Sequence, residues 1–407
     1  MATTPAAQAP AYQGLRVIEL ADDPGGEFCG KLLAQVGADV VKVEPPGGAS
    51  SRSEGPYARG LEDPNHSLPF WYYNVGKRSV VLDLTGDAER ARLRDLLAGA
   101  DVFIYSGQPA VLVELGLTSA ELVRVNAALV TVTITPFGMT GPWANYLSSD
   151  LVAFAASGVL ACCGYDDHSI PPIRPGGSHA YLTAASFAHT ALLISLVARQ
   201  STGAGDFIDV AVHDSMAITV ELANAYWFYS QTPVIRQTCR HAQPLPTART
   251  VFECADGRHI VLVFILNEQR PWAIMVDWLA SHELAFDLSD ERYLDPVFRQ
   301  QNFGHIQEVL EAFFLMIDAE SAFREGQQRG LPLGAVFSPE EVLQLPHLRA
   351  RGFFDHVRIG DVEDVVVTGA PYRFSAFPAA APAPAPGLGE HNGEVFDSAA
   401  EALIEAT

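Results

Sequence analysis

Apolar and polar positions alternate along the first half of the chain in units that predict strands separated by helices. The segments 15–20 and 38–44 have the composition of strands, and 27–36, between them, has the spacing of a helix. The same pattern predicts strands at 79–84, 101–105, 129–134 and 207–212, and helices at 88–98 and 182–200. Because helices separate the strands, we expect a parallel, doubly wound sheet of the α/β class.

The segment 182–200 is apolar around most of its circumference, which predicts a buried helix. After about Met216 the pattern changes to a long helical stretch and then to two alternating runs joined by Asp256-Gly257, which indicates a hairpin. A helical remainder to about Arg329 fits a second, smaller domain. The Pro/Ala-rich stretch 379–386 is expected to run over the surface without forming a packed element.

Composition excludes several classes of function. The 407 residues contain 48 Asp plus Glu and 26 Lys plus Arg, a net charge of −22, which argues against a nucleic-acid partner. The five cysteines are odd in number and form no C-x-x-C pair, so neither a disulfide framework nor a metal site is expected. The amino terminus lacks the pattern of a signal peptide, and the apolar run 151–163 is too short to cross a membrane. We therefore expect a cytoplasmic protein.

Seven segments together resemble the family III CoA-transferases, the group that contains formyl-CoA and carnitine-CoA transferases and α-methylacyl-CoA racemases. The segments are Val36–Gly48, Asn74–Leu84, Ala100–Phe103, Glu114–Leu117, Phe137–Pro142, Thr202–Gly205 and Leu388–Asn392. They follow the order of that family and cover nearly the whole chain. No single segment is specific, but the combination is.

The resemblance implies a Rossmann-like large domain built from both chain ends, a smaller inserted α+β domain, and two ring-shaped subunits threaded into an interlocked dimer. The predicted organisation is a flexible tail at 1–13, the first part of the large domain at 14–215, a linker helix at 216–240, the small domain at 241–330, and a return segment at 331–407 that completes the large domain. The dimer is expected to be a homodimer or a heterodimer with a homologous subunit.

The resemblance also implies a reaction. In that family a carboxylate in the turn before the buried helix attacks an acyl-CoA, and CoA then passes through an enzyme-bound thioester to an acceptor acid. Counting back from Thr202, the family motif Ala-Asp-Leu-Thr-Ala-Gly corresponds to 180–185, so Tyr181 stands at the position of the aspartate. No Asp or Glu lies between His168 and Asp206. A racemase would also need a His where this chain has Ser149.

The segments that would bind CoA are altered as well. Where the family has arginines that face CoA phosphates, this chain has Gln108 and Glu114, and a misplaced carboxylate there costs about 1–3 kcal/mol. The turn Asp22-Asp23 adds carboxylates at a helix N-terminus. The CoA-binding candidates, altered positions included, are Gly25, Gly26, Asn74, Lys77, Arg78, Gln108 and Glu114. The spacing around the two glycines is not that of a dinucleotide site.

Several residues carry alternative interpretations. Tyr181 is interpreted as an aromatic plug, with a hydrogen-bond donor or acid/base role as alternatives. His179 is a candidate general base, although a lone His in a turn is more often structural. The loop carboxylates Asp166 and Asp167 are interpreted as solvated, and the adjacent Cys162 and Cys163 as packing residues.

These observations lead to one hypothesis and two alternatives. The first is the non-nucleophilic subunit of a heteromeric CoA-transferase, whose sister chain supplies the aspartate and which uses CoA or acyl-CoA as substrate without a tightly bound cofactor. The second is a stand-alone lyase, isomerase or hydratase that acts on an acyl-CoA through His179 or Tyr181. The third is a ligand-binding homologue without turnover. The expected small-molecule partners are a carboxylic acid and an acyl-CoA; no nucleic acid or membrane is expected.

Overall fold

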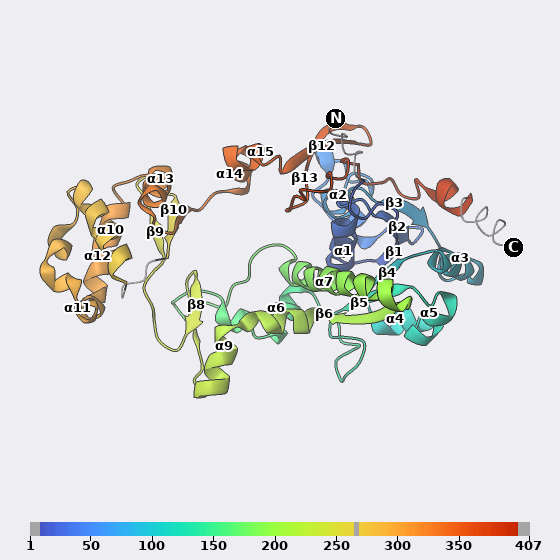
Figure 1. Cartoon of the computed structure of the whole chain (residues 1–407), viewed down its shortest axis with the longest axis horizontal. Helices are drawn as coiled ribbons and strands as arrows, with labels where there is room; N and C mark the ends of the chain where they lie inside the picture. Colours follow the sequence, from blue (N-terminus) through green and yellow to red (C-terminus); the bar gives the residue numbers. More distant parts are fainter. Residues whose placement is uncertain (1–8, 264–267, 398–407) are drawn as a thin grey trace, which may run out of the picture. The chain divides into compact units, whose positions relative to one another are not determined.

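The computed structural model describes residues 9–263 and 268–397 and divides the chain into two compact units (Figure 1). The larger unit comprises Met1–Ser157, Pro175–Thr219 and Pro346–Thr407, and the smaller unit comprises Gly158–Arg174 and Val220–Leu345. Both ends of the chain thus contribute to the larger unit. The domain boundaries expected from the sequence remain predictions, and the two units are described separately below.

The larger unit contains a six-stranded parallel sheet with the order β3-β2-β1-β4-β5-β6. The strands are β1 (Arg16–Ala21), β2 (Asp39–Glu44), β3 (Arg78–Val81), β4 (Val102–Ser106), β5 (Val130–Thr135) and β6 (Asp206–Ala211). The predicted parallel α/β sheet is therefore confirmed. The strand order reverses between β1 and β4, and crevices at such switch points are where doubly wound sheets place ligands.

Helices cover both faces of this sheet. On one face lie α1 (Pro24–Ala34), α2 (Leu68–Asn74) and α7 (His179–Thr202), of which α1 and α7 pack against each other (Figure 1). On the other face, α3 (Asp87–Ala98), α4 (Pro109–Glu114) and α5 (Ser119–Val125) supply the leucines of a core cluster that includes Ile18, Val41 and Phe103. Because both faces are covered, the central strands are buried along almost their whole length.

The prediction of a buried helix at 182–200 is correct for one side of α7 only. Ala184, Ala188 and Leu192 are fully buried, whereas Ile194 and Val197 are 66% and 67% exposed. Among the described residues, α7 is the one helix whose length and apolar composition would allow it to cross a membrane. Its small buried residues pack against the sheet, so it is a partly buried core helix of the larger unit. The sequence could not distinguish the buried side of α7 from the exposed side, because the residues on both sides are apolar.

Short elements replace the linker helix expected over 216–240. After α6 (Asp150–Ala156) and α8 (Val212–Ala217), the chain forms a 3-10 turn at Ile218–Val220, the single-turn α9 (Leu222–Ala225) and a π-turn at Tyr226–Ser230. A two-stranded hairpin of β7 (Ile235–Gln237) and β8 (Arg240–Gln243) follows. The helix is interrupted because Glu221 has a left-handed φ of 38°, and Pro233 cannot continue helical hydrogen bonding.

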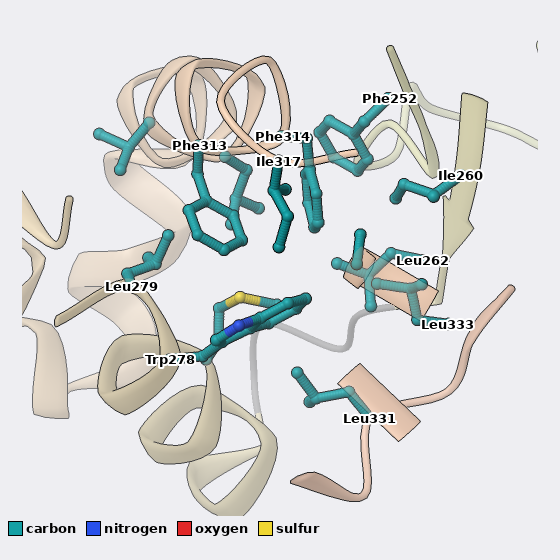
Figure 2. Close-up of a cluster of buried hydrophobic side chains, with 14 of the residues drawn as sticks. Phe252, Ile260, Leu262, Trp278, Leu279, Phe313, Phe314, Ile317, Leu331 and Leu333 are labelled. Atoms are coloured by element: carbon teal, nitrogen blue, oxygen red, sulfur yellow. The ribbon is translucent and has the colours of Figure 1, made fainter. Parts of the chain in front are cut away.

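The smaller unit has its own hydrophobic core (Figure 2). A three-stranded antiparallel sheet of β9 (Val251–Glu253), β10 (His259–Leu262) and β11 (Leu333–Ala335) confirms the hairpin predicted at Asp256-Gly257. Besides α9, the described α-helices of this unit are α10 (Gln269–Ser281), α11 (Pro296–Gln301), α12 (Phe303–Phe314), α13 (Ala319–Arg329) and α14 (Pro339–Gln344). Trp278 lies at the centre of the core against Phe313 and Phe314.

The C-terminal segment returns to the larger unit. After α15 (Pro346–Ala350), the strands β12 (Phe354–Ile359) and β13 (Val362–Thr368) form an antiparallel hairpin. The stretch 379–386 forms no helix or strand, as predicted. The chain then docks on β3, where the Val81 amide donates to Asn392 Oδ1 and the Gly389 amide donates to Ser79 Oγ. The resembling segment 388–392 therefore fastens the end of the chain to the sheet.

Candidate functional site

The carboxyl ends of β1, β4 and β5 place three segments together at the switch point of the sheet. The turn after β1 carries Asp23, β4 ends at Ser106, and the first turn of α7 carries Tyr181. A β-carbon added at Gly25 would lie 3.1 Å from Ile134 of β5 and 3.3 Å from the Tyr181 ring. The glycine therefore lets α1 approach both elements closely, and the phenol ring fills the space beside it.

Asp23 is the N-cap of α1. Its Oδ1 accepts hydrogen bonds from the amides of Gly25 (2.8 Å) and Gly26 (3.1 Å), which is the favourable place for a carboxylate at a helix start. Burial raises the pKa of the Asp23 carboxyl to about 6, against the lowering effect of hydrogen bonds from these two amides and from the Ser106 hydroxyl. The nearby Glu27 acts in the same direction as burial. The expectation that the Asp22-Asp23 turn places a carboxylate at a helix N-terminus is therefore confirmed.

Tyr181 lies in the first turn of α7, half-buried between two carboxylates. Burial, together with the charges of Asp23 and Asp150, raises the pKa of the Tyr181 phenol to about 12. Asp150 itself stabilises the start of α7, because its Oδ1 accepts a hydrogen bond of 2.8 Å from the Ala180 amide. At neutral pH the phenol is therefore protonated. It is able to donate a hydrogen bond but is a poor base and a poor nucleophile.

His179 is the first residue of α7, and its side chain is exposed. Among the described residues, no hydrogen bond involves its imidazole ring; only its backbone carbonyl is engaged, by the Thr183 hydroxyl. A general base is usually held in place by a second group. Ser149, which was compared with the histidine of a racemase on sequence alone, serves as the N-cap of α6.

Asn74 and Lys77 lie away from the switch point, inside the larger unit. The ammonium group of Lys77 donates to Glu19 Oε2 (2.7 Å), to the Glu27 carbonyl (2.7 Å) and to Asn74 Oδ1 (2.9 Å), so all three of its hydrogens are used. Burial lowers the pKa of Lys77, although Glu19 opposes this effect. Arg78 is half-buried and forms an ion pair with Asp39.

Lys42 and Glu44 of β2 complete a buried network of charges that motif analysis missed. Lys42 lies 3.2 Å from Glu19 Oε1 and 2.9 Å from Glu27 Oε1, and all three side chains are at most 1% exposed. Burial disfavours charge on Lys42, but the adjacent Glu27 and Glu19 outweigh it and raise its pKa. The sequence did contain a signal for this network. Charged residues within parallel strands must be buried when helices cover both faces of the sheet.

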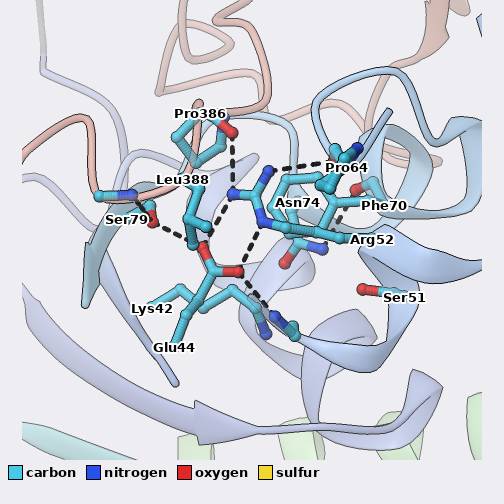
Figure 3. Close-up of polar contacts among 12 residues, drawn as sticks. Lys42, Glu44, Ser51, Arg52, Pro64, Phe70, Asn74, Ser79, Pro386 and Leu388 are labelled. Atoms are coloured by element: carbon cyan, nitrogen blue, oxygen red, sulfur yellow. Dashed lines mark hydrogen bonds and ion pairs between the residues drawn. The ribbon is translucent and has the colours of Figure 1, made fainter. Parts of the chain in front are cut away.

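Arg52 is the buried cation that pairs with Glu44 (Figure 3). Its guanidinium group donates two hydrogen bonds to Glu44, of 2.6 and 2.8 Å, and one of 3.1 Å to the Pro386 carbonyl. It also lies 3.5 Å from the centre of the Phe70 ring. Although burial acts to raise the pKa of Glu44, the hydrogen bond and charge of Arg52 lower it overall. These contacts hold the C-terminal segment on the sheet.

Gln108 and Glu114 lie at opposite ends of α4. Gln108 precedes the helix at the carboxyl end of β4, and its carbonyl accepts a hydrogen bond of 2.7 Å from the Tyr105 hydroxyl. Glu114 is the last residue of α4 and is exposed. The structure therefore brings Gly25, Gly26, Gln108 and Tyr181 to the switch point, whereas Asn74, Lys77, Arg78 and Glu114 lie elsewhere in the larger unit.

The Asp166/Asp167 loop belongs to the smaller unit. Asp166 forms an ion pair with Arg240 and lines a hollow of about 430 Å³ beside β9 and β10. Asp167 accepts hydrogen bonds from Ser169. Burial raises the pKa of both Cys162 and Cys163, so neither is an activated thiolate. Within the described part of the chain, no three His, Cys, Asp or Glu side chains form a group able to hold a metal ion.

Comparisons with known proteins identify the relatives of this chain. The sequence profile of CoA-transferase family III matches residues 12–392. The chain is 33% identical over 394 residues, 95% of its length and 93% of the relative, to succinyl-CoA:(R)-benzylsuccinate CoA-transferase subunit BbsE of Thauera aromatica. It is 28% identical to succinyl-CoA–D-citramalate CoA-transferase of Chloroflexus aurantiacus, over 94% of this chain and 92% of the relative.

A solved structure has the same fold. The crystal structure of a CAIB/BAIF family protein from Brucella suis superposes with a TM-score of 0.82 at 27% identity, covering 96% of this chain and 100% of that chain. The residues that superpose come from both units of the chain.

Proposed function

The chain belongs to CoA-transferase family III, and we propose that it is the non-nucleophilic subunit of a heteromeric enzyme that moves CoA from an acyl-CoA donor to an acceptor carboxylate. The observation that carries the proposal is Tyr181. Tyr181 lies in the first turn of α7, and we infer from the family resemblance that this is the position of the family's aspartate; no acidic residue lies between His168 and Asp206 to replace it.

The chemistry of the reaction explains why this substitution matters. A carboxylate that attacks an acyl-CoA thioester forms a mixed anhydride and releases CoA as its thiolate. The thiolate then attacks the enzyme's carbonyl in the anhydride, which forms the enzyme-bound thioester and releases the donor acid as a carboxylate. A phenol whose pKa is about 12 is almost entirely protonated at neutral pH and cannot supply this nucleophile. We therefore assign Tyr181 the role of an aromatic plug, and we assign the nucleophilic aspartate to a homologous sister subunit.

The relatives support this assignment. The benzylsuccinate enzyme is named as a subunit, and both relatives above are named as users of succinyl-CoA. We accordingly choose succinyl-CoA as the first donor to test. The proposed assembly is an interlocked heterodimer in the cytoplasm that binds acyl-CoA as a substrate and holds no tightly bound cofactor.

The alternatives are less well supported. A lyase, isomerase or hydratase would need an acid or base, but the imidazole of His179 is not held by a second group and the Tyr181 pKa is raised. A ligand-binding homologue without turnover would bind acyl-CoA yet transfer nothing in any assembly. The following test separates these outcomes from the proposal.

The proposal predicts that the purified chain alone does not catalyse exchange of isotope-labelled succinate into succinyl-CoA. In hydroxylamine, which converts a reactive enzyme thioester or anhydride to a hydroxamate, mass spectrometry should find no modified carboxylate on this chain. Co-expression with an aspartate-bearing family III chain should restore exchange, and the hydroxamate should lie on that chain's aspartate. A hydroxamate on this chain would make the proposal wrong, and a product other than a new thioester would favour the second alternative.

With the sister subunit present, replacing Tyr181 with alanine is expected to leave the transfer rate almost unchanged, because a plug contributes packing but no chemistry. The matched control is Tyr105→Ala, which removes a buried phenol at the same edge of the sheet and reports the effect of lost packing together with the loss of its hydrogen bond to the Gln108 carbonyl. Rates would be compared under saturating succinyl-CoA. A loss of about 100-fold for Tyr181→Ala, equivalent to about 2.7 kcal/mol, would contradict the passive role.

A further inference from the structure

Lys31, in the last turn of α1, is a buried lysine without a carboxylate partner. The residue is 2% exposed, and within the described part of the chain no ion pair involves its Nζ atom. The chain contains two other lysines, Lys42 and Lys77, and buried carboxylates hold both of them. Burying a charge without a partner is costly, so a lysine in this position is most stable as a neutral amine.

The contacts of Lys31 Nζ suit an amine better than an ammonium ion. Thr368 Oγ1 is 3.4 Å away, and the centre of the Tyr72 ring is 3.7 Å away. An ammonium ion has three donor hydrogens, so one oxygen and one ring face satisfy it incompletely, although the ring face attracts a cation. Burial lowers the pKa of Lys31 to about 7, and the positive charge of Lys77 acts in the same direction.

These contacts fasten the end of the β12–β13 hairpin to α1. Gln35, one turn further along α1, donates a hydrogen bond of 2.8 Å from Nε2 to the Thr368 carbonyl. Beside this contact lies a hollow of about 70 Å³, whose lining includes Gln35, Thr368 and the stretch 379–383. A two-stranded hairpin is marginally stable by itself. Protection of the hairpin amides therefore reports how firmly the hairpin is docked.

We propose that Lys31 is a proton-operated latch for this hairpin: the neutral amine keeps the end of β13 docked on α1, and the ammonium ion releases it. Protonation places an unpaired charge in a buried position, and the charge reaches water when Thr368 moves away from α1. The hollow gives the end of the hairpin room to move. The latch goes beyond the proposed transferase function, since it needs neither CoA nor a sister subunit.

The groups around Lys31 do not neutralise its charge. The titratable groups on the elements packed against it and against α1 are Glu19, Glu27, Tyr72, Lys77, His189 and Asp355. Buried lysines hold both glutamates. Burial raises the pKa of the Tyr72 phenol and lowers the pKa of the His189 imidazole, so both are uncharged at neutral pH. Asp355 lines the hollow and forms no ion pair with Lys31 within the described residues.

The tip of the hairpin responds to pH in the opposite direction. Asp361 lies 2.9 Å from Arg59 Nη1 and 3.0 Å from His66 Nε2. The hydrogen bond with Asp361 raises the pKa of His66, so this contact is strongest with a protonated imidazole and weakens as the pH rises. A release of the hairpin on acidification is therefore the signature of Lys31 and not of the tip.

The pH range of the release follows from proton uptake. The pKa of the docked amine is about 7, whereas a lysine in water has a pKa of about 10.4, so undocking takes up a proton between these values. Within this range the undocked state gains up to about tenfold for each unit by which the pH falls. Below about pH 7 the amine is charged in both states, and the gain ends.

Hydrogen exchange of the whole protein, followed by mass spectrometry of peptides that cover β12 and β13, tests the latch. Labelling times are scaled to the intrinsic exchange rate at each pH. We expect protection of the hairpin amides to fall by up to about tenfold per unit between pH 9 and about pH 7 and to level off at about pH 6.5. Peptides of α3, on the other face of the sheet, should keep constant protection over the same range.

Two substitutions fix the latch in one state each. Lys31→Met keeps the apolar length without the charge, so protection of the hairpin should no longer rise with pH. Lys31→Arg keeps the charge at every pH, so protection at about pH 9 should be at least about tenfold lower than in the wild type. Gln35→Ala is the matched control, because it removes the other contact with Thr368 and should lower protection equally at every pH.

A rise of protection with pH that persists in Lys31→Met would overturn the inference, as would a Lys31→Arg hairpin that is protected like the wild type. Amine acetylation of the wild-type protein at about pH 8 gives a second measurement that needs no variant. Lys31 should be acetylated at least about tenfold faster than Lys42 and Lys77, which serve as internal controls because buried carboxylates hold them. Equal protection of all three lysines would show that the hairpin does not undock.

Discussion

Replacing Arg52 with alanine is expected to lower the free energy of unfolding of the larger unit by about 3–5 kcal/mol, because it leaves Glu44 buried and without its ionic partner. Both side chains have no exposed surface. Glu44 would keep the hydrogen bonds from Ser79 and the Ala49 amide, which do not neutralise its charge. The substitution also removes the contact with the Pro386 carbonyl, so the C-terminal segment should loosen with it.

Native-state hydrogen exchange of the β2 and β3 amides measures this loss within the larger unit. Arg59→Ala is the control, because the Arg59–Asp361 ion pair is more than half exposed and is expected to contribute at most about 1 kcal/mol. Replacing Arg52 and Glu44 together with methionine should destabilise less than Arg52→Ala, since no unpaired charge remains. Equal effects of Arg52→Ala and Arg59→Ala would show that the buried pair does not stabilise the unit.

Replacing Trp278 with alanine is expected to lower the free energy of unfolding of the smaller unit by about 3–5 kcal/mol, as large-to-small changes at fully buried aromatic residues do. The indole ring packs against Phe313 and Phe314 at centroid distances of 4.9 and 5.8 Å (Figure 2), and its Nε1 donates to Glu325 Oε2 at 2.9 Å. Hydrogen exchange of the α10 and α12 amides would report the change.

Two further variants separate packing from hydrogen bonding at this position. Trp278→Phe keeps most of the apolar contact and removes the hydrogen bond, so it should destabilise less than Trp278→Ala. Glu325 would keep its contact with His282 in that variant. Trp227→Ala, at a tryptophan that is 53% exposed, should change stability by no more than about 0.5 kcal/mol. If Trp278→Ala behaved like Trp227→Ala, the cluster in Figure 2 would not be the stabilising core of the unit.

The candidate site was predictable only in part. The carboxylate cap of the Asp22-Asp23 turn was identified from sequence, because a carboxylate before a helix caps it. The assignment of Tyr181 to the position of the family's aspartate stays a prediction. The packing of Ser106 against Gly26 was not identified, since a serine at the end of a buried strand has no special sequence signal. Gly26 is 80 residues away in the chain, and a β-carbon there would lie 2.4 Å from Ser106 Oγ.

Lys77 is a residue whose sequence context suggests an exposed ligand-binding side chain but whose side chain is buried in the structure. Next to Arg78 in a turn, it has the sequence context of an exposed cation that contacts phosphate. In the structure it is 4% exposed and is held by Glu19 of β1, the carbonyl of Glu27 and Asn74. Sequence position cannot show which side of a strand or helix start a long side chain reaches, because that depends on which strand lies next to it.

The sequence by itself determined the succession of strands and helices, the parallel sheet and the hairpin at Asp256-Gly257, because these follow from local periodicity and turn chemistry. The absence of Asp and Glu between His168 and Asp206 also follows from the sequence alone. The tertiary structure alone decided that α7 is exposed on one apolar side, that six charges form a buried network around Glu19 and Glu44, and that Asp23, Ser106 and Tyr181 lie close to the start of α1. The physical reason is that the strand order β3-β2-β1-β4-β5-β6 joins segments that are distant in the chain, and no local pattern records that order.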